Sequence, residues 1–318
     1  MQLSDPRVIE QWGGGGAAIW WAALNQVDGI GAATMLRLAR AFGSPEAAVN
    51  APADQLTALG RLTPEQAAAV VRQARQIGLL RTMIASWKRA GIGLLAIGDP
   101  SYPAQLLDLK TPPPLLYLRG SPVPEDAQAV AVVGTREPTR EGEVVAAKLS
   151  REFAARGLTN VSGLARGIDT AGHRGSLSAS SGRTIAVLGS GVMRIYPPEN
   201  ARLADEIAKR GCLMSEVPPE TEVSRRFLLA RDRIQAGLSL AVIVVQAHRE
   251  CGSIVTATHA LACRRLLLAV PWETGPFAEG WEKLRSLGAI PIGDAAELDA
   301  IAHRILTPKS PTSQRPLL

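Results

Sequence analysis

The chain has 318 residues, of which 46% are hydrophobic and 20% are charged, a composition typical of a globular fold and unlike that of a fibrous or disordered chain. Its 35 Lys and Arg against 29 Asp and Glu give a net charge of +6, an excess that permits nucleic-acid binding without requiring it. No stretch has the length of a membrane span or the pattern of a secretory leader, so we expect a cytoplasmic protein.

Residues 1–90 are rich in alanine and predict a small all-helical domain. Two helical patterns are separated by Asp28-Gly29-Ile30-Gly31, which predicts a helix-hairpin-helix. The amides at the start of the second helix suit an anion such as phosphate. The turn carries an acid and no lysine, however. The alternative to DNA binding is therefore that the hairpin packs within the protein or contacts a protein partner. A weaker copy follows over residues 59–71, with Thr63 as its expected N-cap.

Residues 91–127 predict a proline-rich connector, because prolines such as 112–114 prevent long helices and favour extended backbone. Apolar residues are interleaved throughout this segment, which indicates an ordered strap rather than a flexible linker. At the other end of the chain, residues 306–318 predict a disordered tail.

Residues 128–305 alternate strand-like apolar runs with helical stretches. Strands linked by helices, and apolar on both faces, predict an α/β fold with a doubly wound, mostly parallel sheet. Ligands of such folds bind at the carboxyl ends of the strands. The six predicted strands lie in residues 129–134, 158–163, 184–189, 212–217, 239–247 and 265–272.

Three successive predicted strands end in glycine, at Gly134, Gly163 and Gly189. Each following loop contains a hydroxyl side chain and an arginine, a combination that grips phosphate through amides and a guanidinium. Several such loops on one sheet edge favour a nucleic-acid strand over a mononucleotide. Alternatively, the glycines only permit close packing of strands and helices. A dinucleotide fingerprint is not predicted, because Arg194 stands where its third glycine is needed.

A further basic stretch lies just before the fifth predicted strand, and it surrounds one aromatic residue with cations. This pattern suits a single strand, whose bases stack while its phosphates pair with arginine. The alternative is a buried phenylalanine on an amphipathic helix with solvated arginines. The residues concerned are Arg225, Arg226, Phe227, Arg231 and Arg233.

Neither a metal site, a cofactor nor an enzyme is expected. His248, Cys251, His259 and Cys263 have ligand types at usable spacings, but no CxxC turn accompanies them, and we interpret them as a surface histidine and packed thiols. The sequence shows no nucleophile, base and acid in the arrangement of a catalytic triad. His173 follows a predicted helix start alone, which is more typical of a structural histidine.

Long motifs over roughly residues 115–295 resemble the DprA/Smf family of DNA-processing proteins of bacterial transformation. They include VVGTREPT, SGLARGIDTAGH, GSGVMRIYPPEN, RDRIQAGLS and CGSIVTATHAL. The resemblance implies an extended Rossmann-like domain that binds single-stranded DNA without sequence preference and without hydrolysing it. It also implies a homodimer that loads the recombinase RecA onto incoming strands.

The resemblance further implies one groove in which successive loops hold successive phosphates and an aromatic ring stacks on a base. Arg136 would hold one phosphate and Arg166 the next, while Phe227 would stack. Gly252 and Ser253, at a helix start, would close the groove. The full set of implied DNA-binding residues is Gly134, Thr135, Arg136, Ser162, Gly163, Arg166, Gly189, Arg225, Arg226, Phe227, Arg231, Arg233, Gly252 and Ser253.

The chain departs from the family pattern FPxRNRIIAGLS, since it has Leu228 for proline and Asp232 for asparagine. An acid there repels phosphate unless Arg231 or Arg233 neutralises it. Two other functions are considered: a nucleotide-cleaving enzyme of a related Rossmann-like superfamily, or a nucleotide-sensing protein. The enzyme hypothesis is disfavoured because the sequence lacks the PGGxGT loop of such enzymes.

Overall fold

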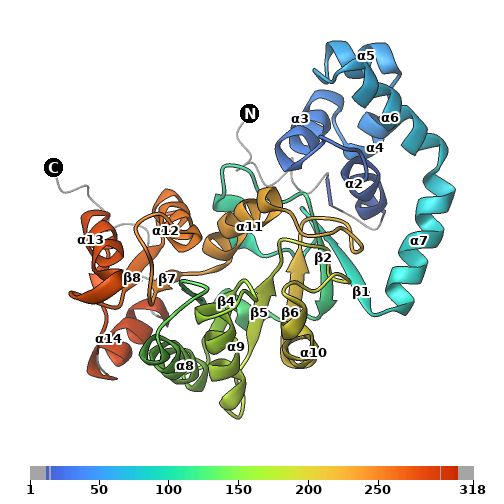
Figure 1. Cartoon of the computed structure of the whole chain (residues 1–318). Coiled ribbons are helices and arrows are strands. Elements are labelled where there is room, and N and C mark those ends of the chain that lie inside the picture. The colour runs from blue at the N-terminus through green and yellow to red at the C-terminus, as the bar shows by residue number, and fades with distance from the viewer. Residues whose placement is uncertain (1–11, 14–15, 294, 307–318) are drawn as a thin grey trace.

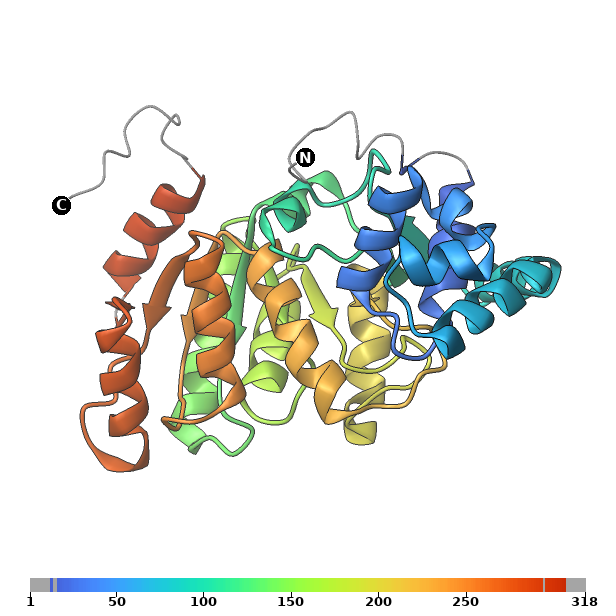
Figure 2. The same ribbon diagram turned by 90° about the horizontal axis from the view of Figure 1, so that it is seen from above.

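The computed structural model describes residues 12–13, 16–293 and 295–306, so the expected tail lies almost wholly outside the described residues. A helical lobe at one end of the elongated molecule is followed by a nine-stranded sheet with helices on both faces (Figures 1 and 2). No helix in the described ranges has the length and apolarity needed to cross a membrane.

The helical lobe is built from short helices, of which the first is apolar on most sides and the longer ones that follow are amphipathic. The hairpin predicted around Asp28 is present between the first two helices, where Gly31 forms the N-cap of the second. The second copy begins at a capping box, because Thr63 and Gln66 accept each other's backbone N–H. The helices are α2 (Ala17–Asn25), α3 (Ala32–Phe42), α4 (Pro45–Val49), α5 (Ala53–Ala58), α6 (Pro64–Arg75) and α7 (Ile77–Arg89).

The sheet has the order β1-β2-β6-β5-β4-β3-β7-β8-β9. Strands β3 to β9 pair in parallel where they are neighbours, whereas β1–β2 and β2–β6 pair antiparallel. The doubly wound, mostly parallel sheet is therefore confirmed. The strands are β1 (Ile92–Ala96), β2 (Leu115–Gly120), β3 (Ala129–Val133), β4 (Thr159–Ser162), β5 (Thr184–Val187), β6 (Cys212–Ser215), β7 (Ala241–Val244), β8 (Leu266–Ala269) and β9 (Ile290–Pro291).

The segment expected to be a connector, residues 91–127, supplies β1 and β2 and is thus part of the sheet. Two short 3-10 turns, η1 (Ala104–Asp108) and η2 (Pro124–Ala127), bracket β2. The prolines do prevent long helices here, but the extended backbone they favour is used for antiparallel pairing.

Helices cover both faces of the sheet (Figure 1), and the chain changes face after β6. Along β3, Val130 and Val132 pack under one layer, while Ala131 and Val133 belong to the core of the other face, as the twofold period of a strand dictates. One layer contains α8 (Arg140–Ala155), α9 (Ile168–Ser178), α10 (Ala201–Arg210) and α14 (Ala295–Leu306); the other contains α11 (Arg225–Leu238), α12 (Gly252–Ala262) and α13 (Ala278–Ser286).

The helical lobe is joined to the sheet by a continuous hydrophobic core. Buried Trp87 of α7 meets Tyr117 of β2 edge to face at 5.8 Å between ring centroids. The Tyr117 hydroxyl donates to Asn25 Oδ1 at 3.1 Å, at the end of α2. These contacts fix the hairpin of the helical lobe opposite α11.

Candidate nucleic-acid interface

The chain runs outward from β3 through β4, β5 and β6, then returns to β7 on the other side of β3. The carboxyl ends of β3 and β7 therefore mark the topological switch point, where such sheets bind ligands. A hollow of about 260 Å³ lies there, and a smaller one of about 20 Å³ adjoins it. Because the two share Arg136, Ala165, Leu228 and Arg231, we treat them as one feature, the switch-point groove.

Eight of the fourteen residues expected to bind DNA line this groove. They are Gly134, Thr135, Arg136, Gly163, Arg166, Arg231, Gly252 and Ser253. Ser162 and Gly189 are buried beneath it. Phe227, Arg226 and Arg233 face a second cavity on the other side of α11, and Arg225 is exposed at the start of that helix. The residues expected to line one groove are thus divided between two hollows, which α11 separates.

Most loop amides and hydroxyls expected to grip phosphate are already satisfied within the protein. The Gly163 N–H donates to Asp169 Oδ2 at 3.1 Å, and the Thr135 N–H donates to the Gln246 carbonyl at 2.7 Å. The Ser162 hydroxyl donates to the Val132 carbonyl at 2.7 Å. The groups that this edge leaves open to an anion are therefore side-chain cations rather than nests of free backbone amides.

Gly189 has a packing role, which was the alternative interpretation of these glycines. A Cβ on Gly189 would lie 2.8 Å from Leu228 Cα, so the glycine lets the start of α11 approach the end of β5. Gly163 is similarly constrained, because a Cβ there would lie 1.7 Å from Arg231 Nη1.

Arg231 forms the floor of the groove and differs from the exposed cation expected from the sequence. It is 6% exposed. Its Nη1 donates to the Val187 carbonyl at 2.9 Å and to that of Gly163. Since it lies on the inward face of α11, it ties this helix to the ends of β4 and β5.

Two carboxylates accompany the buried guanidinium. Asp232 Oδ1 lies 3.2 Å from Arg231 Nε, and Asp169 Oδ2 lies 3.8 Å from Nη2. Burial raises the pKa of Asp232 to about 6, although Arg231 opposes the shift. Burial also raises the pKa of Asp169. One cation facing two acids leaves excess negative charge in the floor once both are ionised, and Asp232 lies beside the first residue of α12.

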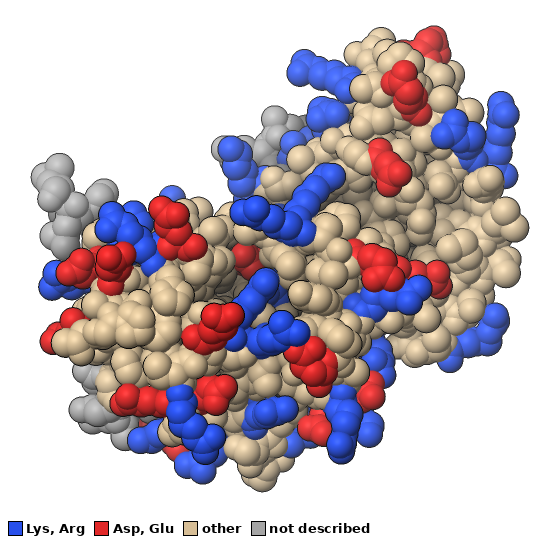
Figure 3. Space-filling view, in the orientation of Figure 1, with Lys and Arg blue, Asp and Glu red and all other residues tan. Residues whose placement is uncertain are grey.

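The rim of the groove carries the exposed cations. Arg136, in the loop after β3, makes no side-chain hydrogen bond or ion pair within the described part of the chain. Arg166, in the loop after β4, pairs with Glu199, and this pair is exposed. Figure 3 shows basic side chains gathered around α11 in the middle of this face, with acidic side chains interspersed.

Tyr196 also lines the smaller hollow and is 38% exposed, beside Arg136 and Arg166. An exposed aromatic ring that lines one hollow with two arginines has the composition of a stacking platform for an unpaired base. Sequence reasoning placed the stacking ring at Phe227 instead. The sequence signal for this ring is Tyr196 itself, two residues after Arg194 in the third glycine loop.

His173 has a structural role. It is fully buried, its Nε2 accepts from the Leu164 N–H at 3.3 Å, and its Nδ1 contacts Thr184 Oγ1 at 2.7 Å. Burial lowers its pKa to about 3, which keeps the ring neutral. Among the described residues, no group of three or more His, Cys, Asp and Glu side chains is arranged to hold a metal ion.

Comparison with known proteins assigns the family. A model described as DNA recombination-mediator protein A matches residues 93–302. The chain belongs to this family. A second model, the SAM-like helix-hairpin-helix tandem, matches residues 22–76. Both the resemblance drawn from the sequence motifs and the predicted helical hairpin are therefore confirmed.

Members of the DNA recombination-mediator protein A family match over much of their length. DNA processing protein DprA of Bacillus subtilis is 39% identical over 221 residues, which cover 69% of this chain and 74% of that protein. Protein Smf of Synechocystis is 35% identical over 256 residues, covering 79% of this chain and 64% of that protein.

Solved structures of family members share the fold. DNA processing protein A of Streptococcus pneumoniae superposes with a TM-score of 0.76 at 27% identity, covering 89% of this chain and 97% of that chain. The Helicobacter pylori protein, whose structure is described in terms of a unique single-stranded DNA binding mode, gives a TM-score of 0.60 at 28% identity, over 68% and 95%.

Proposed function

We propose that the switch-point groove binds single-stranded DNA without sequence preference. The observation that carries this proposal is the exposed Arg136 guanidinium, which makes no ion pair among the described residues and lies beside Arg166 and the exposed Tyr196 ring at a ligand-binding edge. Guanidinium groups bind phosphate whatever the base, and the ring stacks on any unpaired base. The relative described by its single-stranded DNA binding mode supports the assignment.

We propose further that the protein acts in the cytoplasm as a homodimer that loads RecA recombinase onto single strands during DNA uptake and recombination, without cleaving them. The family's description as a recombination mediator supports this role. An accelerated start of RecA filament growth on single-stranded DNA coated with single-strand-binding protein is the expected result. No acceleration at saturating protein would contradict it.

Binding is tested with a labelled 20-base oligonucleotide and a duplex of the same length. We expect the single strand to bind more tightly, and its affinity to fall steeply with salt. Arg136→Ala lowers affinity about tenfold on every sequence and reduces the salt slope by roughly one. Arg81→Ala, at an exposed arginine of α7 outside the groove, is the matched control. Equal affinity of the two variants, or turnover of a free nucleotide by the purified protein, would contradict the proposal.

A further inference from the structure

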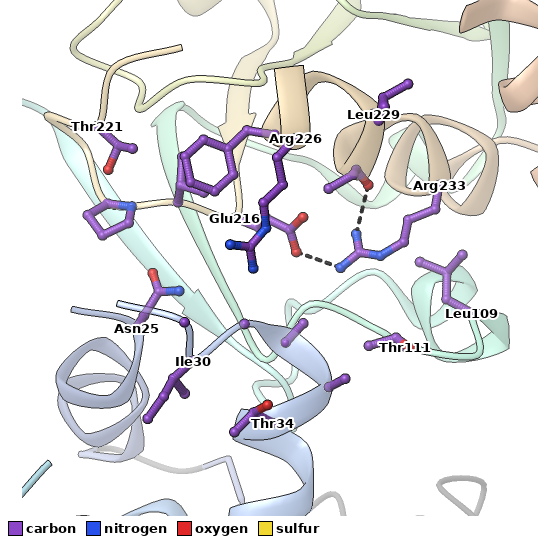
Figure 4. Close-up of a pocket in the computed structure, with 18 of the residues that line it drawn as sticks. Asn25, Ile30, Thr34, Leu109, Thr111, Glu216, Thr221, Arg226, Leu229 and Arg233 are labelled. Atoms are coloured by element: carbon purple, nitrogen blue, oxygen red, sulfur yellow. Dashed lines mark hydrogen bonds and ion pairs between the residues drawn. The ribbon is translucent and has the colours of Figure 1, made fainter. Parts of the chain in front are cut away.

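A second, larger cavity of about 1080 Å³ lies between the helical lobe and α11 (Figure 4). Its walls come from the hairpin turn, the start of α3, one face of α7, and the loop between β6 and α11. Its volume slightly exceeds the range of about 300–1,000 Å³ that is usual for small-molecule sites. The hairpin turn faces inward here, so it serves as a wall of the cavity rather than as a free surface for a duplex.

This cavity adjoins the switch-point groove across the first turns of α11. Leu229 lines both hollows, while Phe227 lines only the cavity and Arg231 only the groove. Arg225 and Arg226 begin the helix between them. A strand that leaves the groove toward the helical lobe therefore passes these two cations before it reaches the cavity.

The charges that line the cavity suit a neutral group rather than a phosphate. Arg233 Nη2 is neutralised by Glu216 Oε2 at 2.5 Å (Figure 4), and Asp108 pairs with Arg265 at 2.8 Å. Apart from Arg226, the remaining charged lining residues are Asp28, Glu220 and Lys110. An interior with no net excess of cations does not attract a polyanion.

Arg226 marks the place where a phosphate fits instead. It is exposed and makes no ion pair or hydrogen bond among the residues that the structure describes. Figure 4 shows it reaching from α11 toward the hairpin, where its Nη2 lies 3.7 Å from the position of a Cβ on Gly31. A phosphate at this guanidinium leaves the attached base free to enter the cavity.

The cavity walls have the surfaces that a base requires. The half-buried Phe227 ring and apolar side chains such as Ile30 and Met83 offer stacking and packing area. Three hydroxyls on different walls, those of Thr34, Thr111 and Thr221, make no hydrogen bond within the described residues and are open to polar base edges.

We propose that the cavity between the helical lobe and α11 receives an unpaired base of the strand held in the switch-point groove, with the adjoining phosphate at Arg226. This inference rests on the proposed function, because it needs a strand in the groove. It assigns Phe227 and Arg226 to a base site separate from the one at Tyr196 and Arg136. It also accounts for the position of the expected DNA-binding residues on both sides of α11.

The test fills the cavity without altering the groove. Ala33→Trp places a ring in the cavity from the exposed start of α3, and Thr111→Trp does so from the segment between η1 and β2. Ala58→Trp, at an exposed position of α5 that does not line the cavity, is the matched control. Thermal melting verifies that each variant is folded, and two blocking positions guard against one variant that fails to fold.

Binding is measured with oligo(dT) of 6 and 20 bases, and with a set of 20-base strands carrying 2-aminopurine at single positions. In the wild type, we expect 2-aminopurine fluorescence to change at a site beyond the groove-bound segment. Both blocking variants abolish this change and weaken 20-base binding roughly five- to tenfold, while 6-base binding is unaffected. Wild-type behaviour of both blocked proteins would overturn the proposal.

The outcomes separate the two proposals. If no oligonucleotide binds, or if Arg136→Ala has no effect, the proposed function fails. If binding depends on Arg136 but ignores the blocking variants, the groove assignment stands and the base site fails. Saturable binding of free dTMP or dAMP that is lost in Ala33→Trp, with strand binding unchanged, would make the cavity a free-nucleotide site and overturn the inference.

Discussion

Arginine occurs both in the floor and at the rim of the switch-point groove, but it has a different role in each place. Arg231 in the floor is buried between Asp169, Asp232 and strand-end carbonyls, and its donors are committed to the fold. Arg136 at the rim is exposed and uncommitted. A guanidinium thus becomes structural when a helix turns it toward strand ends, and available for a ligand when a loop leaves it in solvent.

The largest expected effect is a loss of stability when the arginine in the floor of the groove is replaced. Arg231→Ala leaves two buried carboxylates without their cation and should lower the free energy of unfolding by about 3–5 kcal/mol. Urea denaturation measures this, with the exposed Arg226→Ala as a control that changes stability by less than about 0.5 kcal/mol. An unchanged urea midpoint for Arg231→Ala would erase the distinction between floor and rim.

The next largest effect is a loss of single-strand binding when the aromatic ring at the rim of the groove is removed. Tyr196→Ala removes the exposed ring and should weaken binding of single strands about tenfold, because base stacking on an aromatic ring contributes roughly 1–3 kcal/mol. Tyr196→Phe keeps the ring and should bind like the wild type in the same anisotropy titration. A loss in the Phe variant equal to that in the Ala variant would assign the effect to the hydroxyl instead.

A smaller, pH-dependent effect is expected at Asp232, whose pKa is raised to about 6. Above that pH its charge repels phosphate, so wild-type affinity should rise severalfold from pH 7.5 to pH 5.5. Asp232→Asn should bind more tightly at pH 7.5 and lose most of this dependence in titrations at constant salt.

The same raised pKa affects stability. The folded protein holds this proton more tightly than the unfolded chain, so the stabilising contribution is complete at low pH and is lost as the pH rises through about 6. The stability of Asp232→Asn relative to the wild type should therefore increase between pH 4.5 and pH 7.5 in urea titrations. The opposite trend would contradict the assigned shift.

The smallest effect is expected where the rim cation is already paired. Glu199→Gln releases Arg166 from its exposed ion pair and should strengthen binding about twofold. Glu125→Gln, at an exposed acid of η2 outside the groove, controls for the change in net charge in the same titration. Equal gains from both variants would show only a nonspecific charge effect.

The sequence predicted those features that depend on local pattern. The six apolar runs after residue 128 became β3 to β8, because strands buried on both faces must be apolar throughout. The loops carrying Arg136 and Arg166 were placed at the ligand-binding edge for the same reason. The strands β1 and β2 were missed because their antiparallel partners are remote and prolines obscured their pattern.

The roles of single groups in the groove were not predictable in the same way. Whether the Gly163 amide is free depends on the orientation of Asp169, which comes six residues later on a helix whose position only the fold determines. The inward direction of Arg231 depends on the rotation of α11 about its axis. Burial of the groove floor is thus a property of packing, which residue spacing does not encode.

The contact of Trp87 with Tyr117 has a consequence for cooperativity. Since the helical lobe and the sheet share one core, neither can lose its packing without exposing apolar surface of the other. We therefore expect a single calorimetric transition for the whole chain, and aggregation of a truncated protein that starts at β1. The spacing between α3 and α11 is set by that joint core, not by a hinge.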